Sequence, residues 1–243
     1  MGKSCNSLPM KRFLLWIFLL MILLSPIFLK VGRRIWHPVR MKLTGGKTVS
    51  GIIRELKTRG IPDFGAGDYK KLFVVGLKSE QLLEVYGLDA NQEIHHLKTF
   101  PFTGYSGTLG PKLIEGDRQI PEGIYRVESL NPNSRFHLSV KLDYPNSFDR
   151  KKGALDGRKK LGYDIFIHGK SATVGCIPIG DAGMEELFLM VNQIGKENVE
   201  VILAPLDFRK GLPDPQITSV SWEAELYKSI RERLIQVPKQ VNP

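Results

Sequence analysis

The sequence predicts a fold that is mainly β with some α: a curved β-sandwich or open barrel with one inserted helix and a C-terminal helix. Short apolar runs of strand length recur between Lys71 and Ala204, and a single convincing helix pattern interrupts them. An amphipathic helix pattern then follows near the C-terminus. A chain of 243 residues suits one well-cored domain with appendages.

The first 35 residues predict an N-terminal membrane anchor or signal segment. Phe13 to Leu29 is a run of seventeen residues without a charge, which is the lower limit for a helix that spans a bilayer. A cleaved signal peptide is the alternative, although no Ala-x-Ala-like cleavage site follows the run. A short N-terminal segment with basic residues, followed by one apolar segment, favours export of the remainder of the chain.

The net charge of +10 belongs to this N-terminal part and not to a binding surface. Ten of the 35 basic residues precede Glu55, the first of the 25 acidic residues, so residues 55–243 carry 25 charges of each sign. A balanced domain argues against nucleic acid as a partner.

Residues 36–70 predict a linker followed by one short helix. Thr48 to Arg59 has apolar residues at the i, i+3, i+4, i+7 spacing of an amphipathic helix, namely Val49, Ile52, Ile53 and Leu56. We expect this helix to end at Gly60, with Pro62 just beyond it.

Residues 71–207 predict the main folded domain, which opens with a hairpin. "KLFVVGL" and "QLLEVYGL" are two apolar runs separated by Lys78, Ser79 and Glu80. Further strands are expected at Glu93–Phe102, Gly123–Glu128, Phe136–Leu142, Tyr163–His168 and Val199–Ala204. In "RFHLSVKL" apolar and polar residues alternate, as on a strand with one buried face.

Two helices complete the predicted domain and a C-terminal extension at 208–243. The inserted helix has Asp181 as its N-cap, two glutamates in its first turns and Gly195 at its end. The second runs from Ser221 to Ile235 and places one apolar stripe against the domain: Trp222, Leu226, Ile230 and Leu234.

The cysteine count draws attention to the stretch "IHGKSATVGCIP". Cys5 precedes the apolar segment, so the exported part holds one thiol, Cys176, and no internal disulfide. An unpaired cysteine in an oxidising compartment is a liability unless it is used.

His168 and Cys176 have the elements of a thiolate mechanism, because a histidine can lower the pKa of a thiol or take its proton. The glycine at 175 would let the backbone approach a substrate, leaving the N–H groups of Gly175 and Cys176 free to hold an oxyanion. The alternative is a structural histidine near an inert core thiol.

The motifs around these two residues resemble a known family. "IHG" followed by "TVGCIPI" is similar to the His-Gly and Ser/Thr-x-Gly-Cys signature of YkuD-type L,D-transpeptidases, enzymes of bacterial peptidoglycan. "KLFVVGLKSEQLLEVYGLD", "FPFTGYSG" and "GDRQIPEGIYRV" resemble upstream segments of the family, so that the resemblance covers roughly residues 70–207. "SLNPNSRFHLSVKLDYPNSFDR" and the short gap between histidine and cysteine look most like the YafK-like branch.

The resemblance implies roles for four catalytic residues. Cys176 would be the nucleophile and His168 the base, with the backbone carbonyl of Gly169 orienting the imidazole. Thr173, at the Ser/Thr position of the signature, would be a supporting hydroxyl. No cofactor and no metal are expected.

Two positions depart from the family pattern. Ile120 stands in place of a threonine, and Pro178 stands where many members carry an arginine two residues after the cysteine. Arg135 is the candidate substrate-binding residue that replaces this arginine, against the alternative of an ordinary exposed side chain. Tyr144 is a second candidate, as a residue that lines the substrate groove.

The implied reaction is acyl transfer on peptidoglycan stem peptides. Cys176 would attack the carbonyl before a terminal D-alanine, form a thioester and release D-alanine, and an amine or water would resolve the thioester. A YafK-like amidase or hydrolase of wall crosslinks or protein attachments is an alternative, as is a non-catalytic wall-binding module. The expected location is the bacterial cell envelope, anchored in the inner membrane with the catalytic domain in the periplasm.

Two other features have plain explanations. His95 and His96 would point to opposite faces of a strand, and we expect no Asp or Glu at ligand spacing, which argues against a metal site. The six basic residues between Asp149 and Lys160 fit a solvated loop, or a surface that attracts anionic wall polymer.

Overall fold

The computed structural model describes residues 45–215 and 220–238, and the predicted anchor at Phe13–Leu29 lies outside these ranges. Residues from Lys47 onward form one compact unit. Among the described helices, none has the length and apolar character needed to cross a membrane. The division at residues 35, 70 and 207 remains a prediction.

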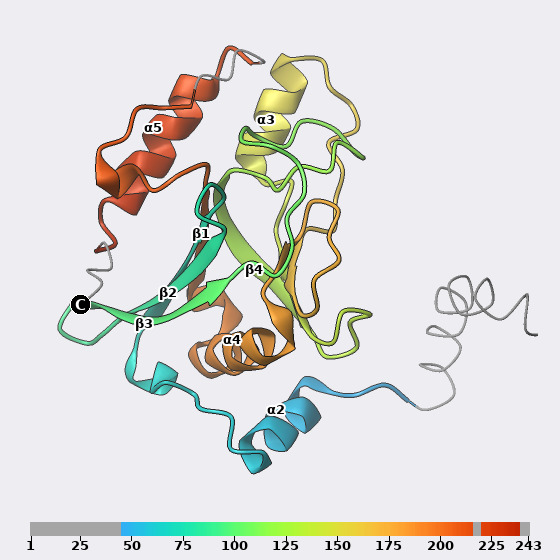
Figure 1. Cartoon of the computed structure of the whole chain (residues 1–243), viewed down its shortest axis with the longest axis vertical. Helices are drawn as coiled ribbons and strands as arrows, with labels where there is room; N and C mark the ends of the chain where they lie inside the picture. Colours follow the sequence, from blue (N-terminus) through green and yellow to red (C-terminus); the bar gives the residue numbers. More distant parts are fainter. Residues whose placement is uncertain (1–44, 216–219, 239–243) are drawn as a thin grey trace, which may run out of the picture. The chain divides into compact units, whose positions relative to one another are not determined.

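The centre of the fold is a mixed eight-stranded sheet that curls as an open half-barrel (Figure 1). Its strand order is β3-β2-β1-β8-β4-β5-β6-β7. Only the pairs β1/β8 and β6/β7 are parallel, and the other neighbours are antiparallel. The strands are β1 (Lys71–Leu77), β2 (Leu82–Leu88), β3 (Ile94–Pro101), β4 (Gly123–Asn131), β5 (Ser139–Leu142), β6 (Phe166–His168), β7 (Ile177–Pro178) and β8 (Val199–Ala204). The predicted mainly β, open-barrel fold is therefore confirmed.

Four α-helices surround the sheet in the described residues, together with three short 3-10 turns. The helices are α2 (Val49–Thr58), α3 (Ser147–Leu155), α4 (Gly180–Ile194) and α5 (Glu223–Leu234), and the turns are η1 (Ala66–Asp68), η2 (Lys196–Asn198) and η3 (Phe208–Lys210). Figure 1 shows α4 and α5 on opposite sides of the central strands.

The central strands are buried on both faces, which explains their almost continuous apolar sequence. Leu72 and Val74 of β1 belong to the core cluster that also contains Phe188 of α4. Phe73 and Val75 belong to the second cluster, which contains Ile230 of α5. Since successive side chains of a strand point to opposite faces, each helix covers one face of the sheet.

Several helix predictions are confirmed in outline. The Thr48 side chain caps α2 by accepting from Gly51 N at 3.0 Å, and Gly195 ends α4 with φ 85°. The predicted stripe on α5 is buried at all four of its positions: Trp222, Leu226, Ile230 and Leu234.

Three local predictions are wrong. Asp181 lies inside the first turn of α4, which begins at Gly180, and its carboxylate accepts the Lys170 N–H at 2.8 Å instead of capping the helix. β5 begins at Ser139 and not at Phe136, since His137 adopts a left-handed φ of 76°. The basic segment after Tyr144 was not expected to be helical, but it forms α3 behind a capping box of Asn146 and Asp149.

Candidate active site

His168 and Cys176 lie on two neighbouring parallel strands. His168 ends β6 and is paired with Pro178 of β7, and Ile167 is paired with Ile177. Extending this register by one residue sets Cys176 beside Phe166, two positions before His168. Cys176 itself lies in the bend just before β7, so the pairing of β6 with β7 holds this bend next to the strand that carries His168.

The imidazole of His168 is held by the neighbouring backbone, as the sequence predicts. Its Nδ1 lies 2.5 Å from the carbonyl oxygen of Gly169, and the ring of Phe136 packs against it with centroids 4.6 Å apart. The carbonyl accepts only if Nδ1 carries the proton, which leaves Nε2 with a lone pair. Gly169 has no room for a side chain, because a Cβ would lie 2.7 Å from the Phe136 carbonyl oxygen.

Burial makes both members of this pair neutral at pH 7. His168 is 1% exposed, and this burial lowers the pKa of its imidazole below 6.5, an effect opposed by the Gly169 carbonyl. Burial also raises the pKa of the Cys176 thiol above 9.0, and the Asp164 carboxylate adds to this. The Phe166 N–H and the Lys112 ammonium act in the opposite direction and lower the thiol pKa. The resting site thus holds a thiol and a neutral base, not a preformed ion pair.

The thiol is turned toward the start of β6 in this structure. Among the described residues its hydrogen bond is to the carbonyl oxygen of Asp164, at 3.6 Å, and not to the imidazole. Transfer of its proton to His168 requires rotation about the Cys176 Cα–Cβ bond, a motion that is fast on the timescale of catalysis.

Two hydroxyl groups fix the backbone around the nucleophile. Thr173 Oγ1 donates to the Cys176 carbonyl at 2.7 Å and accepts the Cys176 N–H at 3.0 Å. Ser106 Oγ accepts the Gly175 N–H at 2.7 Å. The expectation that the N–H groups of Gly175 and Cys176 are free is therefore wrong: both donate within the protein. Their use as oxyanion donors remains a prediction that requires Ser106 and Thr173 to release or share them.

The comparison that decides the family covers more than half of the chain. Residues 70–202 match the model of the YkuD L,D-transpeptidase catalytic domain. The chain belongs to this family. The match begins with β1 and ends within β8, so it includes β6, β7 and the turn that carries Cys176.

The curated relatives agree with this family. The YafK protein of Escherichia coli strain K12, described as a candidate L,D-transpeptidase, is 30% identical over 139 residues, which is 55% of this chain and 54% of YafK. YafK of Escherichia coli O157:H7 gives the same figures. The chain thus matches about half the length of these relatives.

Two solved structures of bacterial proteins are similar to part of this chain. The helical cell shape determining protein Pgp2 of Campylobacter jejuni gives a TM-score of 0.45 at 22% identity, covering 64% of this chain and 55% of Pgp2. Bd1075 of Bdellovibrio bacteriovorus gives 0.42 at 16% identity, covering 69% of this chain and 56% of Bd1075.

The two departures from the YkuD pattern occupy buried positions. Ile120 is fully buried in the larger core cluster, where an isoleucine packs without an unpaired hydroxyl. Pro178 is buried in β7, and its ring lies 3.5 Å from the position of a Cβ at Gly104. A guanidinium at 178 would have to leave this contact, so any cation that binds substrate comes from another segment.

The two predicted substrate-binding residues lie in different environments. Arg135 is exposed, and its carbonyl accepts the Lys170 ammonium at 3.2 Å. Tyr144 is not at the surface: its ring is 3% exposed and its hydroxyl donates to the Leu161 carbonyl at 2.8 Å. The expectation that Tyr144 lines a groove is therefore wrong, because the residue belongs to the core.

Ser106 is the site residue that the sequence analysis missed. It belongs to the segment "FPFTGYSG", which lies across the turn formed by residues 169–176 between β6 and β7. Thr103 N donates to the Pro178 carbonyl at 2.9 Å and Thr103 Oγ1 to the Lys170 carbonyl at 2.5 Å. A Cβ at Gly104 would lie 2.0 Å from the Ser171 carbonyl oxygen, so only glycine permits this approach. The small residues of that segment were the available signal.

A cavity of about 200 Å³ lies beside the turn that leads to Cys176. Asp164, whose carbonyl accepts the thiol, and Val174, two residues before Cys176, are in its wall. The opposite wall comes from the loop between β3 and β4, including Lys112 and Arg118.

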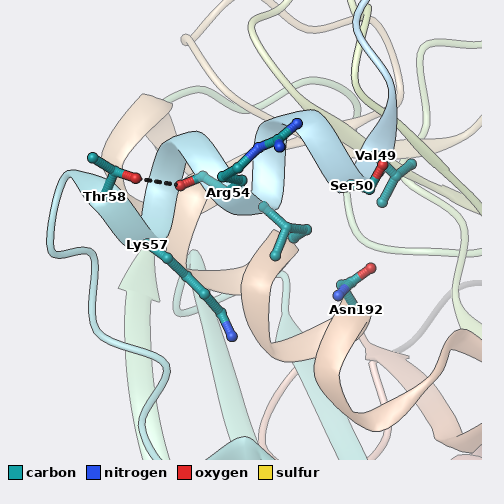
Figure 2. A pocket seen from close by; sticks show the side chains of 7 residues that line it. Val49, Ser50, Arg54, Lys57, Thr58 and Asn192 are labelled. Carbon is teal, nitrogen blue, oxygen red and sulfur yellow. Dashed lines mark hydrogen bonds between the residues drawn. The ribbon is translucent and has the colours of Figure 1, made fainter.

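A larger hollow of about 720 Å³ is open to solvent on α2 and the end of α4 (Figure 2). Its wall contains Ser50, Arg54, Thr58 and Asn192, and the Thr58 hydroxyl donates to the Arg54 carbonyl at 2.9 Å. It has no cysteine, histidine or carboxylate in its wall, so it lacks the groups for acyl transfer.

The structure corrects the argument about His95. Asp89 and Glu93 approach His95 in the turn between β2 and β3, with ligand atoms all within 4.8 Å of one another. The expectation of no nearby Asp or Glu was therefore wrong, because the hairpin brings together residues four and six apart. His95 Nε2 lies 3.0 Å from Asp89 Oδ2, whereas His96 turns to the other face and pairs with Thr99 Oγ1 at 2.8 Å.

Proposed function

We propose that this YkuD-family protein is a cysteine acyltransferase that acts on peptidoglycan stem peptides through a thioester on Cys176. The supporting observation is the geometry of His168: the Gly169 carbonyl accepts a hydrogen bond from Nδ1–H, so Nε2 is left as a base, and the strand that follows Cys176 is paired with the strand of His168. A neutral imidazole is the form that can accept a proton from a neutral thiol.

In the proposed acylation, His168 Nε2 takes the thiol proton as sulfur attacks the peptide carbonyl before the terminal D-alanine. The C–N bond then breaks, the imidazolium returns the proton to the leaving amine, and D-alanine departs. The products of this half-reaction are a Cys176 thioester and free D-alanine. An amine of a second stem then attacks the thioester, again with His168 as base.

An amidase or hydrolase that opens wall crosslinks or protein attachments is the second candidate. The same thioester serves both reactions, and water replaces the acceptor amine. The partly exposed position of Cys176 supports this candidate equally, because water reaches the site as readily as an amine does.

Incubation of the full chain with purified peptidoglycan separates these reactions. Muropeptide analysis should show new linkages for a transferase, trimmed stems for a carboxypeptidase, and released crosslinks for an amidase. Cys176→Ala should abolish every one of these changes. A muropeptide profile that changes equally with wild type and Cys176→Ala would rule out the thioester. A profile that wild type leaves unchanged would leave the non-catalytic wall-binding module.

We also propose a location in the bacterial cell envelope, with residues 13–29 as an inner-membrane anchor and the catalytic domain in the periplasm. The uncharged run and its basic flanks support this. Fractionation should find the full chain in the membrane pellet and a variant lacking residues 1–35 in the soluble fraction. Protease added to spheroplasts should degrade the anchored domain, and protection from that protease would contradict the orientation.

A further inference from the structure

The loop between β3 and β4 places an arginine directly against the nucleophile turn. A Cβ at Gly175 would lie 2.9 Å from the Gln119 carbonyl oxygen and 3.8 Å from the Arg118 carbonyl carbon. Arg118 therefore packs beside the residue that precedes Cys176. The same arginine lines the 200 Å³ cavity next to the thiol, together with Glu115.

The backbone at Arg118 is strained and held in place by a turn built around one carboxylate. Arg118 has a φ of 62°, a conformation that is unfavourable for any residue with a Cβ. The Asp117 carboxylate maintains it by accepting the N–H groups of Leu113, Ile114 and Gln119. Glycine would adopt this turn without strain, and strain of this kind persists most often where a side chain is needed.

The charges around the cavity divide into those that are paired and those that are not. Lys112 is paired with Asp117 at 2.5 Å, and Asp164 is paired with Lys141 at 3.2 Å. Within residues 45–215 and 220–238, neither Arg118 nor Glu115 has an ion-pair partner, and the two do not pair with each other. Both are exposed to solvent. The wall of the cavity thus carries one cation and one anion without ion-pair partners in the described residues, and it includes Asp164, whose carbonyl accepts the Cys176 thiol.

We propose that this cavity binds a free amino-acid head group of the stem peptide, with Arg118 holding its carboxylate and Glu115 its ammonium. A lone carboxylate would be repelled by Glu115 and a lone amine by Arg118, so a group with both charges is the ligand that suits both. The planar guanidinium suits a carboxylate because it can donate two parallel hydrogen bonds. A diamino dicarboxylic acid in the stem carries such a head group at the end of its side chain. Arg118 then supplies the cation that Pro178 lacks and that Arg135 was expected to provide.

This inference rests on the proposed function for its substrate, but its test does not need catalysis. The full chain with Cys176→Ala, which cannot form a thioester, is titrated calorimetrically with a synthetic stem tetrapeptide that contains a diamino dicarboxylic acid. Three further peptides have the side-chain carboxylate amidated, the side-chain amine acetylated, or the terminal D-alanine carboxylate amidated. Arg118→Gln and Glu115→Gln are made in the same background. Arg54→Gln on α2 and Glu232→Gln on α5 are the matched controls.

The Arg118→Gln variant should bind the unmodified peptide about 10- to 100-fold more weakly than the parent. It should also bind the unmodified peptide and the peptide with the amidated side-chain carboxylate with equal affinity. The Glu115→Gln variant should bind the unmodified peptide and the peptide with the acetylated side-chain amine equally well, and it should still distinguish the other two modified peptides. Arg118→Gly should bind as poorly as Arg118→Gln while unfolding at the same temperature or higher, since glycine relieves the strained φ. The two control variants should bind like the parent.

Unchanged affinity in both Arg118→Gln and Glu115→Gln would overturn the inference. The inference would also be overturned if the affinity of Arg118→Gln no longer depended on amidation of the terminal D-alanine carboxylate but still depended on amidation of the side-chain carboxylate. Failure of the proposed function has a different signature: the wild-type chain would bind the unmodified peptide, with the same dependence on Arg118, yet form no thioester.

Discussion

At the scale of single residues, the site depends on how the backbone uses its own polar groups around one thiol. The Gly169 carbonyl sets the His168 tautomer, and the Thr173 hydroxyl bridges both backbone groups of Cys176. A backbone carbonyl carries no full charge, so it orients the imidazole without raising its pKa as strongly as a carboxylate would. The neutral resting pair follows from this choice and from burial.

The neutral pair predicts how Cys176 responds to pH. Because burial raises the pKa of the thiol, alkylation of the free enzyme by iodoacetamide should increase with a midpoint above pH 9. His168→Ala should leave this midpoint in place, since no imidazolium stabilises the thiolate. The rates are measured from pH 6 to 10.5 in a Cys5→Ala background. A midpoint well below 9 that rises in His168→Ala would instead show a preformed ion pair.

Burial of neutral His168 also makes a prediction about stability. Its folded-state pKa is lowered, so the unfolded chain binds the proton more readily and protonation favours unfolding. This contribution is fully present above the unfolded-state pKa of about 6.5, and it is lost progressively as the pH falls from that value through the lowered pKa of the folded state. His168→Gln should therefore flatten the decrease of unfolding free energy between pH 7 and 5, measured by urea titration. An unchanged slope would contradict the burial of a neutral imidazole.

Thr173 should be required for activity through its contacts with Cys176. Thr173→Val removes both hydrogen bonds and leaves the Cys176 N–H unpaired, which destabilises the backbone at Cys176 by about 1–3 kcal/mol. Acylation should therefore become at least about tenfold slower. Thr173→Ser retains the hydroxyl and should keep most of the activity. D-alanine release is the measurement, and equal activity of the valine and serine variants would remove the assigned role.

At the scale of elements, the nucleophile turn is held between the β6–β7 pair and the segment that carries Ser106. Gly104 is the tightest contact between them, with a Cβ position 2.0 Å from the Ser171 carbonyl oxygen. Gly104→Ala should therefore destabilise the protein by about 1–3 kcal/mol. It should also slow acylation, because the segment that carries Gly104 and Ser106 must move away from Cys176. Gly67→Ala is the matched control, since nothing lies within 4 Å of its Cβ position. Denaturant unfolding of both variants tests this, and equal stability would show that the crossing is loose.

Sequence patterns predicted those elements whose residues follow one clear period. β8 has the predicted bounds Val199–Ala204, and the stripe on α5 is buried as expected. The patterns failed where backbone conformation or capping overrides hydrophobicity. His137 takes a left-handed φ inside an alternating run, and α3 starts from a capping box in a segment with little apolar content.

The same limit applies to the site. The pairing of His168 with the Gly169 carbonyl was predictable from a resemblance to the YkuD family, and the structure contains this contact. The approach of Ser106 and Arg118 to Gly175 was not predicted, since both belong to a loop more than 50 residues earlier in the chain. Only the folded sheet brings that loop to the turn.

At the scale of the whole domain, a buried ion pair links the loop over the active site to the C-terminal helix. Lys78 Nζ donates to Glu122 Oε1 at 2.7 Å and to the carbonyl of Gly110 at 2.8 Å, and the pair has no side-chain exposure. Tyr227 of α5 donates to Glu122 Oε2 at 2.8 Å. Lys78 was expected in the connection of the first hairpin, so this link between β1, the loop and α5 was not evident from the sequence.

Breaking this network should destabilise the domain strongly. Lys78→Met leaves Glu122 buried and unpaired, which costs about 3–5 kcal/mol. Lys78→Met combined with Glu122→Gln should cost less than the sum of the two single changes, because no buried charge remains. Urea titrations of the three variants measure this coupling, and simple additivity would show that the pair contributes nothing as a pair.

The central claim is that Cys176 forms a thioester with a stem peptide by giving its proton to His168. Intact-protein mass spectrometry after incubation with a stem tetrapeptide tests it most directly. Wild type should gain the mass of the peptide minus D-alanine, His168→Ala should acylate about 10²- to 10⁴-fold more slowly, and Cys176→Ala should gain nothing. A wild-type chain that binds the peptide but never gains this mass, or an adduct that persists in Cys176→Ala, would contradict the account.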